Sequence, residues 1–201
     1  SYANCRMWDL GKQARFVYAS SAATYGDGAN GMADLHLENI TSLKPLNMYG
    51  YSKHLFDLHA LRHGYFESIV GLKYFNVFGP NEAHKGDMRS VVYKAYHHIL
   101  EQGAVNLFKS YHPDYNDGEQ MRDFLYVKDA VQMTMTLAES SEAHGLFNLG
   151  SGTANTWVEL VTGIFEALNL PPKINFIDMR THLKDKYQYF TLAQTGHLQQ
   201  Y

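Results

Sequence analysis

Cysteine is almost absent from this sequence, because Cys5 is the only one among 201 residues. A single cysteine excludes an intrachain disulfide framework and a zinc site built from several thiolates. This cysteine usage is typical of a protein in a reducing compartment, so we expect a location in the cytoplasm.

Long apolar runs and runs of basic charge are also missing. No stretch approaches the ~20 consecutive apolar residues that a membrane-spanning helix needs. The net charge is only −3, with both signs mixed along the chain, which argues against nucleic acid or an anionic membrane surface as the main partner. Because 45% of the 201 residues are hydrophobic, the chain can bury the core of one full domain or of parts of two.

The chain opens with "SYANCRMWDL", which has neither an initiator methionine nor the pattern of a signal peptide. These first ten residues have the pattern of the last turns of a helix that leads into a strand. We therefore expect the sequence to be a fragment that starts inside a domain.

Short apolar segments alternate along the chain with longer amphipathic ones. This order is typical of an α/β fold, in which helices cover a mostly parallel sheet. Thr156 and Glu159 have the spacing of a capping box, which predicts that a helix begins there. The expected strands are 15–20, 68–80, 105–109, 123–127, 145–152 and 173–178, and the expected helices are 49–63, 88–102, 128–140 and 156–169.

Gly26, Gly28 and Gly31 match the G-x-G-x-x-G pattern and follow an expected strand. In a dinucleotide site the last glycine of this pattern opens a helix, and an acidic residue follows about 20 positions later at the end of a second strand. Residues 32–47 show no clear strand, so a flexible loop is the favoured interpretation of this segment.

Tyr49 and Lys53 lie one helical turn apart in an expected helix, so their side chains share a face. The lysine ammonium can stabilise the ionised phenol, which is the form that acts as a general base. The alternative is a packed tyrosine beside a solvated lysine, since a chain with 15 tyrosines is expected to contain about one such pair by chance. Ser20, Ser21 and Thr24 follow the first strand, where open α/β sheets bind their ligands.

Five segments occur in a characteristic order: "YASSAATYG", "PLNMYGYSK", "GLKYFNVFGP", "RDFLYVKDA" and "FNLGSG". Together they resemble the extended short-chain dehydrogenases/reductases, the family of nucleotide-sugar epimerases and dehydratases. The resemblance covers nearly the whole chain and implies a Rossmann-like, doubly wound parallel sheet with a smaller α/β substrate-binding domain. The implied cofactor domain comprises residues 1–75, 123–154 and 188–201, and the substrate domain comprises 76–122 and 155–187.

Within this family, "YFNVFGPNEAHKGDM" and "YQYFTLAQ" resemble the enzymes that act on nucleotide-linked heptoses, and "HKG" is their most diagnostic part. The resemblance implies inversion of C6'' of an ADP-heptose through a transient ketone, for the lipopolysaccharide inner core. The implied cofactor is tightly bound NADP, with NAD as the other candidate, and the implied assembly is a homo-oligomer.

The resemblance also implies roles for individual residues. Tyr49 and Lys85 are the two expected acid/base residues, Ser21 supports the substrate hydroxyl, and Lys53 binds the cofactor ribose. The cofactor is expected to contact Tyr49, Lys53, Val77 and Lys85. The residues expected to bind the sugar nucleotide are Asn76, Asp87, Lys94, Phe108, Lys109, Ser110, Tyr111, Arg122 and Tyr187.

The sequence departs from the family pattern in several places. The loop between Tyr25 and Tyr49 is longer than expected, the segment 107–122 is altered, the N-terminal glycine-rich turn that grips the cofactor pyrophosphate is missing, and the chain stops early at Tyr201. Two alternatives therefore stay open. One is another sugar-nucleotide enzyme of the family, such as a UDP-hexose 4-epimerase or a dehydratase, although "SSAATYG" lacks the acidic pair of a dehydratase. The other is a non-catalytic module that binds sugar nucleotides.

His59 and His63 have the i, i+4 spacing of two zinc ligands on a helix. The glutamate that normally stands between such ligands is missing, and no third ligand is evident. The segment 114–119 resembles a calcium loop, but its glycine and its closing residue are misplaced. We therefore expect no metal site.

Overall fold

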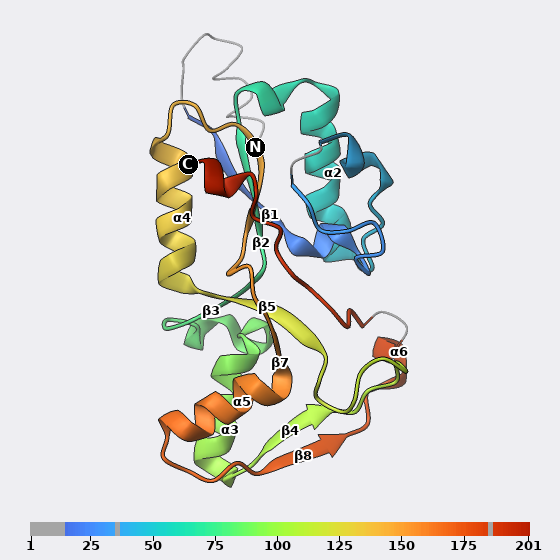
Figure 1. The fold of residues 1–201 in the computed structure, drawn as a ribbon, viewed down its shortest axis with the longest axis vertical. Coiled ribbons are helices and arrows are strands. Elements are labelled where there is room, and N and C mark those ends of the chain that lie inside the picture. Colours follow the sequence, from blue (N-terminus) through green and yellow to red (C-terminus); the bar gives the residue numbers. More distant parts are fainter. Residues whose placement is uncertain (1–14, 35–36, 185–186) are drawn as a thin grey trace.

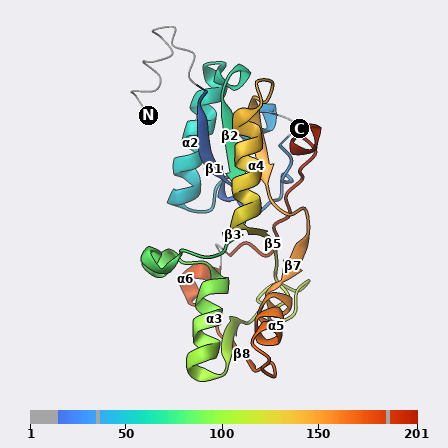
Figure 2. The same ribbon diagram turned by 90° about the vertical axis from the view of Figure 1, so that its left-hand side faces the viewer.

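The computed structural model describes residues 15–34, 37–184 and 187–201. A parallel sheet with strand order β1-β2-β6 forms one end of the elongated molecule (Figure 1). Its strands are β1 (Val17–Ser21), β2 (Val70–Tyr74) and β6 (Gly145–Leu149). Helix α2 (Met48–Arg62) covers one face and α4 (Val127–Glu139) the other (Figure 2). The α/β fold class expected from the alternating pattern is confirmed.

The core of this sheet has two apolar layers, one on each face. Leu72, Phe147 and Leu149 pack with Leu137 of α4 on one face. On the other face, the buried residues are Ile40, Ala60, Phe66, Ile69 and Leu146. Because both faces are covered, almost every residue of β2 and β6 is buried, as is usual for parallel sheets.

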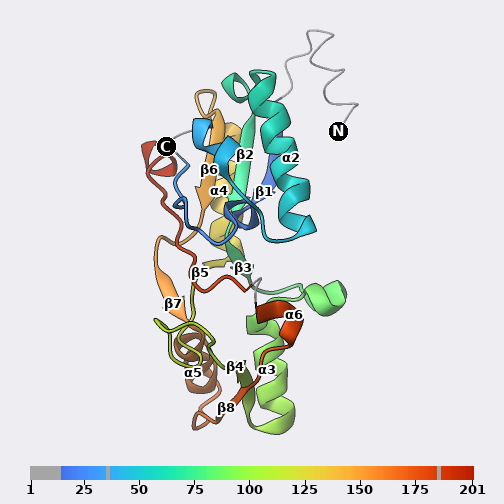
Figure 3. The ribbon, with the colours of Figure 1, turned by 90° about the vertical axis from the view of Figure 1, so that its right-hand side faces the viewer.

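The opposite end of the molecule has smaller sheets packed on two helices (Figures 1 and 3). In one sheet, β5 (Met121–Tyr126) pairs in parallel with β3 (Asn76–Phe78) and antiparallel with β7 (Ala154–Thr156). In the other, β4 (Val105–Phe108) pairs in parallel with β8 (Ile174–Ile177). Helices α3 (Val91–Gln102) and α5 (Trp157–Ala167) supply the core through residues that include Ile99 and Phe165.

Short helices complete the described chain. They are η1 (Ala22–Tyr25), η2 (Leu37–Ser42), η3 (Tyr65–Glu67), η4 (Ala83–Met88), α6 (Thr181–Lys184) and η5 (Leu198–Gln200). Within the described ranges, no helix is long and apolar enough to cross a membrane.

Two expectations about the strands were wrong. The single strand expected over 68–80 is divided at Phe75, whose amide donates to Leu149 O while Val77 N donates to Phe75 O, so the chain leaves one sheet and enters another. Strand β7 was not expected, because a three-residue edge strand carries almost no periodicity of its own. The helical turns expected within residues 1–10 lie outside the described residues.

Candidate active site

Tyr49 and Lys53 lie in the first turns of α2, which begins where the Asn47 side chain accepts a hydrogen bond from Gly50 N at 2.9 Å. The Tyr49 side chain is 54% exposed. Lys53 Nζ donates to Ala19 O at 2.9 Å and lies 6.0 Å from the centre of the Tyr49 ring. The two residues therefore share a partly exposed face of α2 beside strand β1, as their spacing predicts.

Ser21 ends strand β1 and caps the short helix η1, because its hydroxyl accepts a hydrogen bond from Ala23 N at 3.1 Å. The first turn of α2 packs directly on η1. A Cβ atom added to Gly50 would lie only 2.7 Å from Ala23 O, so glycine permits this close approach. The structure thus brings the Ser21 segment next to the turn that carries Tyr49.

Lys85 lies in η4, on the connection between β3 and α3. Its ammonium is 3.7 Å from Glu82 Oε2 and its side chain is 46% exposed. Glu82 is buried and accepts hydrogen bonds from Gly79 N and from both Ser90 N and Ser90 Oγ. Burial raises the pKa of Glu82, but these hydrogen bonds outweigh it and hold the pKa below its usual value. The carboxylate therefore fastens both ends of the loop that carries Lys85.

Asn76 and Val77 lie in β3, directly after the point where the chain leaves the large sheet. The Asn76 amide donates to Asp123 O at 3.1 Å and to Thr191 Oγ1 at 3.3 Å. Asp123 itself is fully buried, and its carboxylate accepts hydrogen bonds from Ser151 N, Ser151 Oγ, Gly152 N and Ala193 N. Asp123 was not expected to have a role, although an aspartate inside an apolar strand is a signal of a buried, hydrogen-bonded carboxylate.

Arg122 lies in β5 with its guanidinium close to two aromatic rings, 5.6 Å from the centre of Trp157 and 5.3 Å from that of Tyr187. It donates to the carbonyls of Met121 and Gln188. Burial lowers its pKa. Trp157 Nε1 donates to Tyr187 Oη at 2.9 Å. Arg122 and Tyr187 were expected at the site, whereas Trp157 was missed.

A cavity of about 650 Å³ opens beside this cluster, between α3 and strand β4. Three of the expected substrate-binding residues line it, namely Lys94, Phe108 and Tyr187. Lys94 Nζ also donates to Asp87 O at 2.6 Å. Other residues lining the cavity were not expected, among them Arg89, His97, His98 and Trp157. Its aromatic walls and basic groups suit a ligand with a planar base and negative charge.

The remaining expected residues lie in the loop after β4. Lys109 Nζ is 3.4 Å from Asp178 Oδ1, and Tyr111 Oη donates to the same oxygen at 2.7 Å. Ser110 N donates to Asp117 Oδ1 at 2.7 Å. This loop was the part of the substrate site that the altered segment 107–122 left uncertain. Two carboxylates hold it, Asp117 within the loop and Asp178 directly after β8.

His59 lies in the last turn of α2 and His63 caps that helix, and their ring centres are 4.1 Å apart. His63 Nδ1 is 2.8 Å from His59 O. Among the described residues, no group of three or more histidine, cysteine, aspartate or glutamate side chains is placed to hold a metal ion.

The residues at the edge of the sheet fit one end of a dinucleotide. Strands β1, β2 and β6 run parallel and reach the same edge of the sheet with Ser21, Tyr74 and Leu149. Ligands of open α/β sheets bind at this carboxyl edge. The ammonium of Lys53 and the phenol of Tyr49, held beside β1, suit a ribose and a nicotinamide.

The model of the NAD dependent epimerase/dehydratase family matches residues 4–150 of the chain. Curated relatives named ADP-L-glycero-D-manno-heptose-6-epimerase include one from Nitratidesulfovibrio vulgaris strain Hildenborough, 56% identical over 185 residues, and one from Fusobacterium nucleatum, 41% identical over 197 residues. These matches cover 92% and 94% of this chain but 57% and 59% of the relatives. The chain therefore spans a little over half the length of these relatives.

Solved structures show the same similarity. The Helicobacter pylori ADP-L-glycero-D-manno-heptose-6-epimerase superposes with a TM-score of 0.75 at 29% identity, covering 98% of this chain and 56% of that one. The Thermus thermophilus UDP-glucose 4-epimerase in complex with NAD superposes with a TM-score of 0.73 at 24% identity, covering 98% of this chain and 60% of that one, and shows the shared fold alone.

Proposed function

The chain belongs to the NAD-dependent epimerase/dehydratase family, and we propose that it forms the catalytic and sugar-nucleotide-binding part of an ADP-L-glycero-D-manno-heptose 6-epimerase. One observation carries this proposal. The hydrogen bond from Lys53 to Ala19 O holds the first turns of α2, with Tyr49, beside the strand that ends at Ser21. The 56% identity to a relative of that name supports the choice of substrate.

The reaction converts ADP-D-glycero-D-manno-heptose to its C6'' epimer by way of a ketone. A nicotinamide dinucleotide bound at the carboxyl edge of the sheet, NADP or NAD, supplies a reversible hydride acceptor. Lys53, Tyr49 and Val77 are the residues of this chain that would hold its ribose and nicotinamide end. A ketone has no configuration at C6'', so reduction from the opposite face inverts the centre.

In this scheme Tyr49 takes the proton of the C6'' hydroxyl and returns it. The ammonium of Lys53 stabilises the phenolate that accepts this proton. The Ser21 hydroxyl, at the end of β1, orients the substrate oxygen. Because the second epimer presents its hydroxyl from another direction, Lys85 serves as the second acid/base group.

The sugar nucleotide occupies the cavity beside the Arg122 cluster. Its base packs against Phe108 and Tyr187, and its diphosphate lies towards Lys94 and Arg122. Guanidinium groups pair well with phosphate oxygens, and aromatic walls suit a purine. Asn76, Asp87 and the loop that contains Lys109, Ser110 and Tyr111 complete the sugar-nucleotide site.

This arrangement divides the chain into interleaved parts. Residues 1–75, 123–154 and 188–201 belong to the cofactor domain, and residues 76–122 and 155–187 to the substrate domain. We also propose that the enzyme is a homo-oligomer that works in the cytoplasm, in agreement with its single cysteine.

The test uses a chimaera in which this chain replaces the matched region of the 56%-identical relative, and we call this protein the extended enzyme. ADP-D-glycero-D-manno-heptose is added, and proton NMR follows the signal of the C6'' epimer. We expect interconversion to an equilibrium mixture, whereas UDP-glucose should stay unchanged. Conversion of UDP-glucose to UDP-galactose without heptose epimerisation would overturn the substrate assignment.

A further inference from the structure

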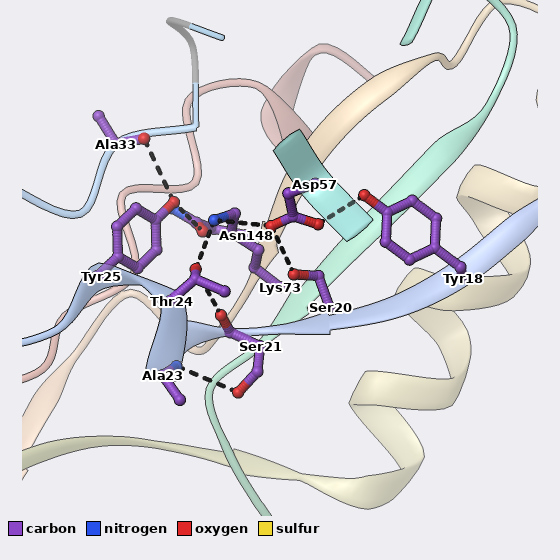
Figure 4. Close-up of polar contacts among 10 residues, drawn as sticks. All are labelled: Tyr18, Ser20, Ser21, Ala23, Thr24, Tyr25, Ala33, Asp57, Lys73 and Asn148. Carbon is purple, nitrogen blue, oxygen red and sulfur yellow. Dashed lines mark hydrogen bonds and ion pairs between the residues drawn. The ribbon is translucent and has the colours of Figure 1, made fainter. Parts of the chain in front are cut away.

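A buried ion pair lies behind the candidate active site, between helix α2 and strand β2 (Figure 4). Lys73 Nζ is 3.3 Å from Asp57 Oδ2. Lys73 is 1% exposed and Asp57 is 0% exposed. The chemistry assigned above does not use either residue, so their burial needs another explanation.

Asp57 ties α2 to strand β1. Its Oδ1 accepts a hydrogen bond from Tyr18 Oη at 2.7 Å, and its Oδ2 accepts one from Ser20 Oγ at 2.8 Å. One helical turn earlier, Lys53 is bonded to Ala19 O of the same strand. Two successive turns of α2 are therefore hydrogen-bonded to three consecutive residues of β1, Tyr18, Ala19 and Ser20.

Lys73 connects the same hydrogen-bond network to the residues that follow β1. Its ammonium donates to Thr24 Oγ1 at 2.5 Å, and Thr24 Oγ1 in turn donates to Ser21 O at 2.8 Å. The ammonium also lies 4.4 Å from the centre of the Tyr25 ring. A single buried cation thus connects the helix that carries Tyr49 with the backbone of Ser21.

Stability alone does not account for this pair. Removing two charges from water costs about as much as their attraction returns, so a well-packed apolar pair of similar volume is often as stable. The best-attested benefit of a buried pair is that it specifies one register between two elements. Here the ion pair joins α2 to β2, and the hydrogen bonds from Tyr18 and Ser20 to Asp57 extend the contact to β1. The network therefore holds α2, which carries the acid/base residue, against β1, which carries the hydroxyl that orients the substrate.

We propose that Asp57 and Lys73 are positioning residues that set the register of α2 on β1, and with it the position of Tyr49 relative to Ser21. This inference rests on the proposed function for its catalytic consequence, but the register itself is a property of the chain. A displacement of about 1 Å at a reacting group can cost about 100-fold in rate.

The test is the double variant Asp57→Leu/Lys73→Met, which removes both charges and leaves neither unpaired. Its control is Thr134→Val, which removes the 2.7 Å hydrogen bond between α4 and Tyr74 Oη without changing a residue at the edge of the sheet. In the extended enzyme we expect kcat of the Asp57/Lys73 variant to fall at least about 10-fold with KM little changed. The control should keep the kcat of the unmodified enzyme.

Hydrogen exchange on the 201-residue chain gives a readout that is independent of activity. In the Asp57/Lys73 variant, amides of residues 51–54 should exchange about 10-fold faster, and those of α4 should be unchanged. In the control, amides of α4 should exchange faster, and those of residues 51–54 should be unchanged. If residues 51–54 of the Asp57/Lys73 variant exchange as slowly as in the control, and its kcat equals that of the control, the pair is merely structural and the proposal is wrong. If the unmodified extended enzyme shows no epimerase activity, the proposed function fails, and the exchange data still decide the register.

The double variant can fail to fold, so a second one keeps the test decisive. Tyr18→Phe/Ser20→Ala leaves the ion pair intact and removes the two hydroxyl groups that bind Asp57 to β1. We expect the same fall in kcat and the same local exchange. Unchanged kcat and unchanged exchange in this variant would overturn the proposal.

Discussion

Trp157 donates a 2.9 Å hydrogen bond from its indole nitrogen to the hydroxyl of Tyr187, and the guanidinium of Arg122 lies beside both rings. The position of the indole follows from the start of α5. Thr156 accepts a hydrogen bond from Glu159 N, and Glu159 accepts one from Thr156 N, so the helix begins at Trp157. The capping box therefore positions the Trp157 ring, which contacts Arg122 and Tyr187 from distant segments of the chain.

This relationship predicts a shared effect on nucleotide binding. Trp157→Phe keeps an aromatic face for Arg122 but removes the N–H donor, so the affinity of the chain for ADP should fall about 5-fold, the equivalent of roughly 1 kcal/mol for one hydrogen bond. Tyr187→Phe should cause a similar loss. Because both changes remove the same bond, the double variant should lose little more than either single one. Calorimetric titration with ADP measures all three, and fully additive losses would contradict the coupling.

Tyr49→Phe in the extended enzyme should lower the epimerase rate by about 10²- to 10⁴-fold, the usual loss on removal of a general acid/base. Folding should be unaffected, because the side chain is 54% exposed. Tyr51→Phe is the matched control, since Tyr51 is also an exposed tyrosine of α2. Initial rates with ADP-heptose separate the two, and a Tyr49→Phe enzyme as fast as the control would exclude Tyr49 as the acid/base residue.

Lys85→Met should separate inversion from hydride transfer. If Lys85 is the second acid/base group, the extended enzyme should still form the ketone by way of Tyr49 but should yield the inverted epimer at least about 100-fold more slowly. Absorbance of the reduced cofactor reports the first step, and NMR of C6'' reports the second. Lys128→Met, at an exposed lysine of α4, is the control. A raised KM with a normal kcat would show instead that Lys85 only binds substrate.

The burial of Asp34 leads to a prediction of how the free energy of unfolding depends on pH. Asp34 is 5% exposed, and its Oδ2 accepts a hydrogen bond from Asn148 N at 2.7 Å. Burial raises the pKa of Asp34. As the pH rises, the Asp34 carboxyl therefore loses its proton at a lower pH in the unfolded chain than in the folded one. Its contribution to the free energy of unfolding is complete below the unfolded-state pKa of about 4, and it is lost as the pH rises through the higher pKa of the folded state.

The Asp34→Asn variant removes this dependence. It should be more stable than the original chain at pH 7 by on the order of 1 kcal/mol, and no more stable at pH 3. Urea unfolding at the two pH values provides the measurement. Asp27→Asn, at an exposed aspartate of the same loop, is the control. An equal gain at both pH values would show that the buried charge is not the cause.

Much of the local structure could be predicted from the sequence. Alternating apolar patterns predicted most of the strands and the four long helices, but not strand β7 or the break at Phe75. The Thr156–Glu159 spacing predicted the start of α5, where the structure has the full capping box. The shared face of Tyr49 and Lys53 followed from the helical period alone. Each of these features depends on residues a few positions apart, whose geometry the backbone itself determines.

The contacts between distant segments were decided by the tertiary structure. Lys73 of β2 forms an ion pair with Asp57 of α2. The Asp123 carboxylate accepts hydrogen bonds from amides of two different loops. Trp157 donates a hydrogen bond to Tyr187, thirty positions further along the chain. The chain turns at Phe75 because its amide pairs with Leu149 O of another strand. Such pairings depend on the register of strands and on how helices pack against them, and neither leaves a periodic mark in the sequence. The sequence therefore determined which residues share a helix face or a strand end, and packing decided which of them meet across the fold.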